Sequence, residues 1–442
     1  MKTVVIIDAG GRGSALVHAY AKSSQVGKII AIPGNDYMQI NSSKPVNTYP
    51  QLKTTSIPEI LEICKKEKVD LIEVAQDNAV AAGLVDALEK EGFIVFGPNK
   101  VQGELEWSKA FARKFMKKYE IPQPEFAVFE SVDDGIAYLQ NQPDQSWFVK
   151  ASGLAEGKGA LPAANNAEAE ERIVELQKFG DAGKTYLLEK WLKSEDGSNA
   201  EEFSAFALSD GNSWQHIGFV QDHKRALDGD KGENTGGMGV STPPLVITEN
   251  VKKQTEEIFS KTFEGMKKEG RAYKGVLYLG GILVGGKVYV VEYNARWGDP
   301  EVEVLLPGIT KDYFDIVSVI TQQGLHTIVI TTDGKARVGV CGSAKGYPGD
   351  YSGVKGKKIT GLENAKNVVV YGAGIKKDGS NFVVNGGRVF YVIGEGKDVL
   401  EARNKAYDAL ESISIEGENL YYRKDIGWRD VQRLTSNNKN AS

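Results

Sequence analysis

The sequence predicts a multidomain protein of mixed class, with an α/β domain at the N-terminus followed by α+β units. Three observations support this prediction. The chain has 442 residues, which at roughly 100 to 200 residues per domain corresponds to two to four packed units. Strand-like and helix-like segments alternate through the first hundred residues, which favours a parallel, Rossmann-like sheet. A Gly-Pro-Asn break at residues 97–99 then ends that alternation and marks a domain boundary.

Composition restricts the class of protein and its partners. Hydrophobic residues make up 41% and charged residues 26% of the chain, unlike a disordered protein. The formal charge of −5 argues against a broad nucleic-acid surface. Cys64 and Cys341 have no zinc or disulfide spacing, and neither a membrane-spanning run nor a signal peptide is evident. We therefore expect a cytoplasmic monomer or small homo-oligomer with no nucleic-acid or membrane partner.

The first domain begins with a β-branched strand at residues 3–7, a glycine-rich loop at 9–13 and a helix at 14–22. A second strand at 28–32 ends in a loop at 33–36. The same pattern continues with a helix at 57–66, a strand at 70–74, a helix at 79–91 and a strand at 93–96. Ligands of such sheets bind beyond the carboxyl ends of the strands. The loops at 9–13 and 33–36 are therefore candidate walls of a site.

The glycine cluster Gly10, Gly11 and Gly13 leaves several interpretations open. It lacks the order G-x-G-x-x-G of dinucleotide sites, so nicotinamide binding is poorly supported. The glycines could simply permit a tight turn between strand and helix. Alternatively, backbone N–H groups at the start of the helix could hold a phosphate.

The second domain opens with a predicted helix at residues 105–119 that carries five basic side chains. Most of this charge is expected to be a solvated face. Lys109 lies early in the helix, where the following domain could present it to a nucleotide. A surface lysine is the competing interpretation.

A strand end followed by a glycine-rich hairpin at residues 149–160 is the first strong motif. Its glycines would let the backbone approach phosphate oxygens, and its lysines would offset their charge. The residues concerned are Lys150, Gly153, Gly157, Lys158 and Gly159. The segment is no Walker A loop, because glycine follows the Gly-Lys pair and no helix follows directly. It predicts a phosphate lid, with a solvated hairpin as the alternative.

A hinge that could bind an adenine edge is predicted at residues 186–192, an apolar strand with a charged bend containing Glu189, Lys190 and Leu192. The polar stretch 193–199 follows it. A further strand at 201–208 would then place Glu202 near the same pocket, unless that carboxylate lies on the surface.

The second strong motif spans residues 221–239 and contains too many charges and glycines to form an apolar core. A long polar loop of this kind usually carries function, although a disordered surface loop is the alternative. Asp222, Lys224 and Arg225 supply fixed charges, and residues 234–237 supply backbone donors for an anion. His223 is interpreted as structural or substrate-positioning.

The third strong motif spans residues 290–301 and follows strands predicted at 276–283 and 288–293. Alternation along a strand puts Glu292, Asn294 and Arg296 on one face. The first two supply hard oxygen ligands for Mg²⁺, and the arginine can bind a carboxylate or phosphate with two parallel hydrogen bonds. A ladder of structural ion pairs is the competing interpretation.

These motifs, in this order, resemble the phosphoribosylamine–glycine ligase family of the ATP-grasp superfamily, and the resemblance covers nearly the whole chain. It extends to segments at 97–98, 108–112, 386–389 and 421–427. The resemblance implies an N-terminal substrate domain at 1–102, an ATP-grasp domain at 103–325 with a mobile lid at about 122–190, a C-terminal domain at 326–435 and a tail at 436–442.

The resemblance also implies roles for individual residues. ATP would contact Lys109, Lys150, Gly153, Gly157, Lys158, Gly159, Glu189, Lys190, Leu192 and Glu202. Glu292 and Asn294 would hold Mg²⁺ or Mn²⁺. Substrates would lie against Gly11, Asp222, Lys224, Arg225, Gly236, Gly237, Arg296, Gly298, Asp299 and Glu301. Arg296 and Lys150 would be the catalytic residues, stabilising charge on the phosphoryl group as glycine forms glycyl phosphate before phosphoribosylamine displaces phosphate.

Departures from the family pattern fall mainly in the N-terminal domain. Gly13 and Ser14 stand where the family usually has Glu and His, residues 75–78 replace its Gly-Pro-Glu, and residues 194–199 lengthen the hinge. A paralogous ligase that uses another amine is therefore the alternative function. A non-catalytic nucleotide-binding regulator is less well supported, because this chain keeps the lysines and the metal ligands.

Overall fold

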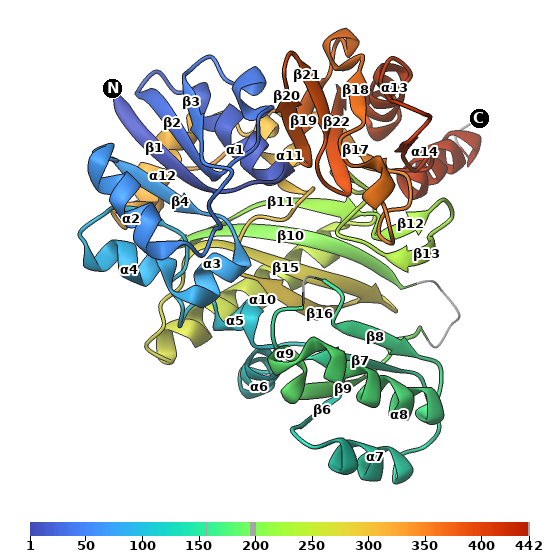
Figure 1. Cartoon of the computed structure of the whole chain (residues 1–442). Helices are drawn as coiled ribbons and strands as arrows, with labels where there is room; N and C mark the ends of the chain where they lie inside the picture. The colour runs from blue at the N-terminus through green and yellow to red at the C-terminus, as the bar shows by residue number, and fades with distance from the viewer. Residues whose placement is uncertain (156, 195–199, 441–442) are drawn as a thin grey trace.

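The computed structural model describes residues 1–155, 157–194 and 200–440, with side chains described through Ser436. Figure 1 shows an N-terminal lobe in blue, a long central sheet in yellow-green, a small green lobe below it and a red C-terminal lobe. The segment at 195–199, which includes most of the expected hinge insertion, lies outside the described residues. Across the described part of the chain, no helix has both the length and the apolar character needed to cross a bilayer.

The N-terminal lobe is a five-stranded parallel sheet in the order β3-β2-β1-β4-β5, which confirms the predicted Rossmann-like class. Its strands are β1 Lys2–Asp8, β2 Val26–Pro33, β3 Val46–Thr48, β4 Leu71–Val74 and β5 Val95–Phe96. The connecting helices are α1 Gly11–Ala21, α2 Ile57–Lys66, α3 Asp77–Ala82 and α4 Leu84–Lys90. Helices cover both faces, so β1 is buried from Val4 to Asp8.

Two predicted helix boundaries in this lobe were wrong. Helix α1 begins at Gly11 and not at residue 14, so the expected loop 9–13 is largely its first turn. A β-carbon at Gly11 would lie 2.5 Å from Glu303 Oε1, which explains why glycine starts a tightly packed helix there. The helix expected at 79–91 is divided at Gly83, whose φ of 83° ends α3 in the left-handed conformation.

The predicted helix at 105–119 is also two helices, α5 Glu104–Trp107 and α6 Lys109–Lys118. Ser108 between them has an extended backbone, and its Oγ accepts a hydrogen bond from Phe111 N at 3.2 Å. This N-cap places Lys109 at the first position of α6. The boundary between α5 and α6 therefore positions Lys109, the lysine predicted to face a nucleotide.

The small lobe below the central sheet is an antiparallel sheet in the order β6-β9-β7-β8. Its strands are β6 Phe126–Phe129, β7 Trp147–Ala151, β8 Ala160–Ala163 and β9 Tyr186–Lys190, with helices α7 Val132–Gln140, α8 Asn166–Glu175 and α9 Asp181–Lys184. Leu139, Trp147 and Ile173 belong to an apolar cluster confined to this lobe. The lobe thus has a core of its own.

The central sheet has nine strands and is antiparallel, in the order β16-β15-β10-β11-β14-β17-β22-β19, with β24 paired to β17. The strands are β10 Glu201–Asp210, β11 Trp214–Asp222, β14 Gly239–Thr242, β15 Lys274–Val284, β16 Lys287–Asn294, β17 Ala336–Ala344, β19 Val369–Gly372, β22 Arg388–Gly396 and β24 Leu420–Tyr421. Helix α10 Glu249–Lys268 shares an apolar cluster with this sheet. C-terminal strands therefore continue the sheet that the middle of the chain begins.

The remaining strands lie in the C-terminal lobe and in the polar segment 221–239. That segment is not a simple loop, because it contains the two-stranded ribbon β12 Arg225–Leu227 and β13 Lys231–Asn234. A four-stranded sheet orders β20 Ile375–Asp378, β21 Asn381–Val384, β18 Lys358–Thr360 and β23 Ser414–Ile415. The further helices are α11 Val302–Leu305, α12 Tyr313–Thr321, α13 Val399–Leu410 and α14 Trp428–Asn440. The expected tail 436–442 overlaps the end of α14.

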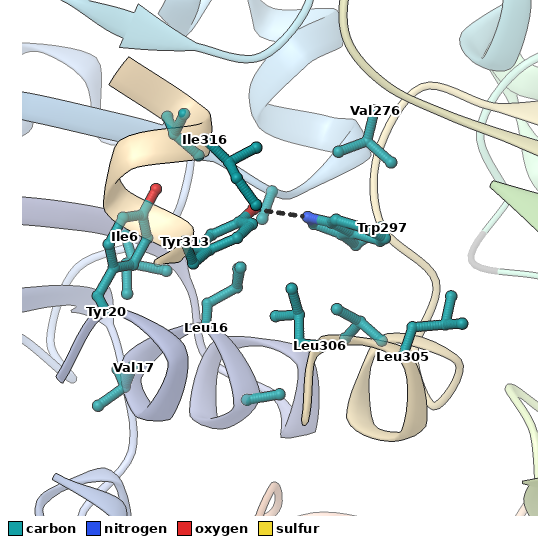
Figure 2. Packing of buried hydrophobic residues seen from close by; sticks show 14 of the residues in the cluster. Ile6, Leu16, Val17, Tyr20, Val276, Trp297, Leu305, Leu306, Tyr313 and Ile316 are labelled. Carbon is teal, nitrogen blue, oxygen red and sulfur yellow. Dashed lines mark hydrogen bonds between the residues drawn. The ribbon is translucent and has the colours of Figure 1, made fainter. Parts of the chain in front are cut away.

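One apolar cluster joins the N-terminal lobe to the central sheet. Figure 2 shows Leu16 of α1 beside Leu306, with Tyr313 of α12 facing Trp297, and Leu305 belongs to the same cluster. These side chains are at most 5% exposed. The loop that follows β16 is therefore held between two lobes.

Candidate active site

Glu189 lies at the centre of a buried ion cluster between the small lobe and the central sheet. Arg113 Nε is 2.7 Å from Glu189 Oε1, and Lys150 Nζ is 2.6 Å from Oε2. Burial opposes ionisation of this carboxyl, but Arg113 and Lys150 outweigh it and lower the pKa of Glu189 to about 2. Arg113 is only 2% exposed, whereas Lys114, Lys117 and Lys118 of the same helix are exposed, so most of the basic charge is solvated as predicted and Arg113 is the exception.

The start of α6 is bonded to the glycine-rich hairpin. Lys109 N donates to Ser152 O at 2.9 Å, and Lys109 Nζ lies 3.3 Å from Gly153 O. Burial lowers the pKa of Lys109, while Glu292 opposes that shift. A β-carbon at Gly153 would lie 2.8 Å from Ala182 Cα, so this glycine permits close packing on α9.

The end of the hairpin is more open than its base. Gly157 has a φ of 77°, no described residue beyond its chain neighbours comes within 4 Å of a β-carbon placed there, and Lys158 is exposed. At Gly159, in contrast, a β-carbon would approach Ala155 Cβ to 2.7 Å. The open end is therefore the part of the hairpin best placed to approach a ligand.

Glu292 on β16 lies among four basic side chains. Burial opposes its ionisation, but Lys224, Lys150, Lys109 and Arg296 lower the pKa of Glu292 below its ordinary value. In the same order, the four come from the segment after β11, from β7, from the start of α6 and from the loop after β16. Together they concentrate positive charge around one carboxylate, an arrangement suited to a polyphosphate with a bound cation.

Two further predicted residues border this charged centre. Glu202 Oε2 is 3.2 Å from Lys224 Nζ, and Glu202 is the main cause of the raised pKa of Lys224. Asn294, at the end of β16, accepts a hydrogen bond from Arg296 through Oδ1 at 3.2 Å. The Nδ2 of Asn294 is buried and has no hydrogen-bond partner among the residues that the structure describes.

Arg296 reaches this place by a different route from the one predicted. Strand β16 ends at Asn294, so Arg296 is not on the strand, and alternation along the strand does not place it. Its NH1 donates to Trp297 O at 2.9 Å, and its Nε lies 3.0 Å from Glu106 Oε1. Burial raises the pKa of Glu106 to about 7, although Arg296 opposes the shift.

Asp299 is held by residues from two distant parts of the sequence, Arg12 near its start and the pair Arg388 and Tyr391 on β22. Tyr391 OH donates to Asp299 Oδ1 at 2.7 Å, Arg12 N donates to Oδ2 at 3.2 Å, and Arg388 NH1 donates to Asp299 O at 2.8 Å. Burial opposes ionisation of Asp299, but Arg388 and Arg12 lower its pKa. Arg388 also donates to Gly236 O at 2.6 Å, which ties the polar segment 221–239 to this loop.

Several polar atoms near Asp299 have no partner among the described residues. Asp222 Oδ1 is buried without a hydrogen bond, as are both carboxyl oxygens of Glu303. Burial, with help from Glu301, raises the pKa of Asp222, and burial, with help from Asp299, raises that of Glu303. A β-carbon at Gly237 would lie 2.9 Å from Asp222 Oδ1.

Glu301 and Gly298 complete this end of the site. Ser204 Oγ donates to Glu301 Oε1 at 3.1 Å, while a β-carbon at Gly298 would lie 2.2 Å from Glu301 Oε2. The loop at 298–301 therefore packs tightly on itself. Glycine is required there by the neighbouring carboxylate.

Other predicted residues have partners outside the charged centre. Lys190 pairs with Glu125, and Arg225 NH1 donates to Gly232 O at 2.9 Å within the β12–β13 ribbon. Leu192 follows β9 and is half-buried. His223 Nε2 accepts a hydrogen bond from Gly427 N at 3.1 Å. Burial, with help from Arg423, lowers the pKa of His223 to about 3, and its interpretation as structural or substrate-positioning stays a prediction.

Sequence reasoning missed several contributors to the site. They are Arg12, Glu106, Arg113, Glu303, Arg388 and Tyr391. Arg388 belongs to a Gly-Gly-Arg segment that the resemblance had noted, and Arg12 lies in the glycine cluster, so both offered a signal. The others became visible only through contacts between distant segments.

The geometry separates into two ends. One is a cationic end around Glu292 and Glu189, and the other is an acidic end around Asp222, Asp299 and Glu303 with unpaired oxygens. Within the described residues, no three His, Cys, Asp or Glu side chains converge as an independent metal site.

Family models match almost the whole chain. The phosphoribosylglycinamide synthetase N domain matches residues 2–106, the ATP-grasp (A) domain 107–302 and the C domain 337–429. The phosphoribosylamine–glycine ligase of Chlorobaculum tepidum is 38% identical over 431 residues, covering 96% of this chain and 99% of that one. The enzyme of that name from Caldanaerobacter subterraneus is 35% identical over 430 residues, covering 96% and 99%.

Solved structures give a consistent result. The crystal structure of phosphoribosylamine–glycine ligase from Thermotoga maritima matches with a TM-score of 0.79 and 32% identity, covering 96% of this chain and all of that one. Biotin carboxylase from Campylobacter jejuni matches with a TM-score of 0.69 at 16% identity, covering 97% and 98%. The second likeness is one of fold alone.

Proposed function

The chain belongs to the phosphoribosylglycinamide synthetase family, and we infer from this membership that it is an ATP-dependent, ADP-forming ligase that joins glycine to phosphoribosylamine in purine biosynthesis. The observation that supports this most directly is the cationic centre around Glu292, with an acidic end a short loop away. Such a centre suits ATP phosphates, and the acidic end suits an amine and a sugar.

We propose that the reaction proceeds in two balanced steps. A glycine carboxylate oxygen attacks the γ-phosphorus, the bond to the bridging oxygen breaks, and ADP leaves with the electron pair. The amine nitrogen of phosphoribosylamine then attacks the carbonyl carbon of glycyl phosphate, inorganic phosphate leaves, and the nitrogen loses a proton. Exclusion of water would protect the acyl phosphate.

Within this proposal the basic side chains neutralise charge. Lys109, Lys150 and the hairpin backbone would face the ATP phosphates, and Lys190, Leu192 and Glu202 would lie nearer the nucleoside. Glu189 is a special case, because its carboxylate already pairs with Arg113 and Lys150. Glu189 would therefore act on ATP chiefly through Arg113 and Lys150, the two cations that it orients.

Arg296 is the side chain that we assign to glycine. Each terminal nitrogen of a guanidinium carries two N–H groups, and NH1 and NH2 each use one, on Trp297 O and Asn294 Oδ1. Two N–H groups remain for a carboxylate. The acidic end, with Asp222, Gly237 and Asp299, would receive the amine and sugar.

Glu292 and Asn294 fit a divalent cation, Mg²⁺ or Mn²⁺. They supply two hard oxygen donors from one strand, and the partnerless Nδ2 of Asn294 is consistent with an amide whose final orientation is set by a ligand. When bound, the ion would neutralise charge on the phosphates of ATP. Lys150 and Arg296 would stabilise the remaining charge on the transferring group.

The domain borders also belong to this proposal. We assign residues 1–102 to a substrate domain, 103–325 to the ATP-grasp domain with a mobile lid at about 122–190, and 326–435 to the C-terminal domain. The separate apolar core of the small lobe supports the lid. We further propose a cytoplasmic monomer or small homo-oligomer without nucleic-acid partners, in keeping with two buried free thiols and a net charge of −5.

The proposal is tested by measuring ADP release from purified protein with ATP, magnesium and glycine, with and without freshly generated phosphoribosylamine. Release that requires both substrates is the expected result. If ADP release does not respond to phosphoribosylamine in protein that binds ATP, the altered first loop selects another amine, and the substrate assignment fails.

A further inference from the structure

A buried hydrogen-bonded chain runs from the N-terminal sheet to the loop that carries Arg296. Glu73 on β4 accepts from Tyr20 OH at 2.6 Å and from Tyr313 OH at 3.0 Å. Tyr313 OH in turn accepts from Trp297 Nε1 at 3.0 Å, the dashed contact in Figure 2. All four side chains are at most 4% exposed.

Stability alone does not explain a carboxyl at this position. Burial raises the pKa of Glu73 to about 7 despite hydrogen bonds from Tyr20 and Tyr313, and Asp8 adds to the shift. A buried ionisable group is often replaceable by apolar side chains without loss of stability. What such a group can supply is a fixed arrangement of its partners.

Among these partners, Trp297 is the one that connects to Arg296, because its backbone carbonyl is hydrogen-bonded to residues on both sides of the site. Trp297 O accepts from Arg12 NH1 at 3.0 Å and from Arg296 NH1 at 2.9 Å. Arg296 continues the chain to Asn294 Oδ1 at 3.2 Å. A shift of the indole would therefore move the carbonyl that orients the guanidinium.

The indole has one polar atom in otherwise apolar surroundings. Its ring stacks on Phe206 at a centroid distance of 5.7 Å and packs against Leu305 and Leu306. Removing the oxygen of Tyr313 would delete the 3.0 Å hydrogen bond of the indole N–H and leave it with the carboxyl of Glu73, the other group that it faces. Reorientation of the ring is the available response.

We propose that Glu73, acting through Tyr313 and Trp297, is a positioning residue that fixes the guanidinium of Arg296 for the carboxylate of glycine. This role rests on the proposed function, because it requires Arg296 to bind glycine. Glu73 and Tyr313 themselves do not touch a reactant. Their effect reaches the substrate through the backbone of residue 297.

Tyr20 offers a matched control. It donates to the same carboxyl at 2.6 Å, and its ring lies edge-on to that of Tyr313 at 5.0 Å, but no described hydrogen bond links it to Trp297. Tyr313→Phe and Tyr20→Phe each delete one buried hydroxyl that donates to Glu73. Only the first interrupts the chain to Arg296.

The experiment compares steady-state kinetics and thermal unfolding of the wild type, Tyr313→Phe, Tyr20→Phe and Glu73→Gln. We expect Tyr313→Phe to raise the KM for glycine about fivefold, equivalent to roughly 1 kcal/mol, with the KM for ATP unchanged. Tyr20→Phe should lose similar stability but keep the KM for glycine. Glu73→Gln, which keeps the shape of the side chain, should also raise the KM for glycine.

The outcomes separate the two proposals. If the wild type does not release ADP with both substrates, the proposed function fails and the positioning role falls with it. If the wild type is active but Tyr313→Phe and Tyr20→Phe change the KM for glycine equally, only the positioning role is overturned. If Tyr313→Phe does not fold, Glu73→Gln decides, and an unchanged KM for glycine in that variant counts against the role.

Discussion

Glu189 and Glu303 are both buried glutamates near the candidate site, yet their surroundings are opposite. Glu189 receives Arg113 on one oxygen and Lys150 on the other, and its pKa falls to about 2. Glu303 is fully buried, neither of its oxygens has a hydrogen-bond partner in the described part of the chain, and burial together with Asp299 raises its pKa. One carboxyl is compensated within the protein, whereas the other is not.

This difference distinguishes a framework from a binding surface. The ion cluster of Glu189 joins α6, β7 and β9 and so fixes two cations where we propose that the ATP phosphates bind. Unpaired buried polar groups cost free energy and tend to persist where function requires them. The cationic end of the site is thus complete before any ligand binds, and the acidic end is not.

Removing the framework should give the largest change in stability. Arg113→Leu leaves Glu189 buried with one cation fewer, which should lower the free energy of unfolding by about 3–5 kcal/mol. Lys114→Leu, at the exposed neighbouring position, is the control and should change it by less than about 0.5 kcal/mol. Urea unfolding measures both, and equal midpoints would contradict the framework role.

The same pair predicts a pH dependence. Because the pKa of Glu189 falls from 4.5 to about 2 on folding, its contribution to stability is present above pH 4.5 and is lost as the pH falls toward 2. The difference between the wild type and Arg113→Leu should therefore shrink over this range. A difference that stays constant with pH would mean that Glu189 is not the partner whose charge matters.

Removing the proposed metal ligand should give the largest change in activity without loss of fold. Glu292→Ala should lower ADP formation at least about 100-fold, or roughly 2.7 kcal/mol, because charge on the phosphates loses a cation. Glu257→Ala, an exposed glutamate on α10, serves as the control. Near-normal turnover of Glu292→Ala, with unfolding like that of the wild type, would remove Glu292 from the site.

The sequence predicted the cationic end better than the acidic end, and the reason is distance along the chain. Lys109, Lys150 and Glu292 lie in local patterns that have meaning on their own. Arg113 looked like part of a solvated helix face because its partner Glu189 is 76 residues away. Arg388 meets Asp299 across 89 residues, a contact that neither segment indicates by itself.

The fold, too, was predicted best where the contacts are local in the sequence. Alternating strands and helices predicted the parallel N-terminal sheet, because each unit is local. The break at Ser108 depends on a cap and on bonds to Ser152, and the pairing of β14 with β17 joins segments about a hundred residues apart. Helix propensity along residues 105–119 does not indicate the break at Ser108, and the local sequences of β14 and β17 do not indicate that the two strands pair.

Ligand binding should next alter the hairpin at the cationic end. Lys158 is exposed and should be cut by trypsin in the free protein. A hydrolysis-resistant ATP analogue with magnesium, at ten times its Kd, should slow this cleavage about tenfold if only the open state is cut. Cleavage at exposed Lys377 on β20 is the internal control, and equal cutting at Lys158 with and without nucleotide would argue against a lid.

The smallest expected effect tests the acidic end directly. A carboxyl whose pKa is raised by folding makes the protein less stable as the pH rises above the ordinary value of 4.5. Glu303→Gln keeps the shape without the titration, so at pH 8 it should exceed the wild type in free energy of unfolding by about 1 kcal/mol. At pH 4 the two proteins should differ little, because both side chains are then neutral.

The pH dependence of stability expected from Glu303 has the opposite sign to that expected from Glu189. The sign of the measured difference therefore decides whether Glu303 is paired with a cation. If Glu303→Gln is less stable than the wild type at pH 8, then the carboxylate of Glu303 has a cationic partner in solution. Glu303 would then belong to the framework, as Glu189 does. If the variant is more stable, the unpaired carboxyl is retained at a cost to stability, and that cost is the reason to look for its benefit in substrate binding.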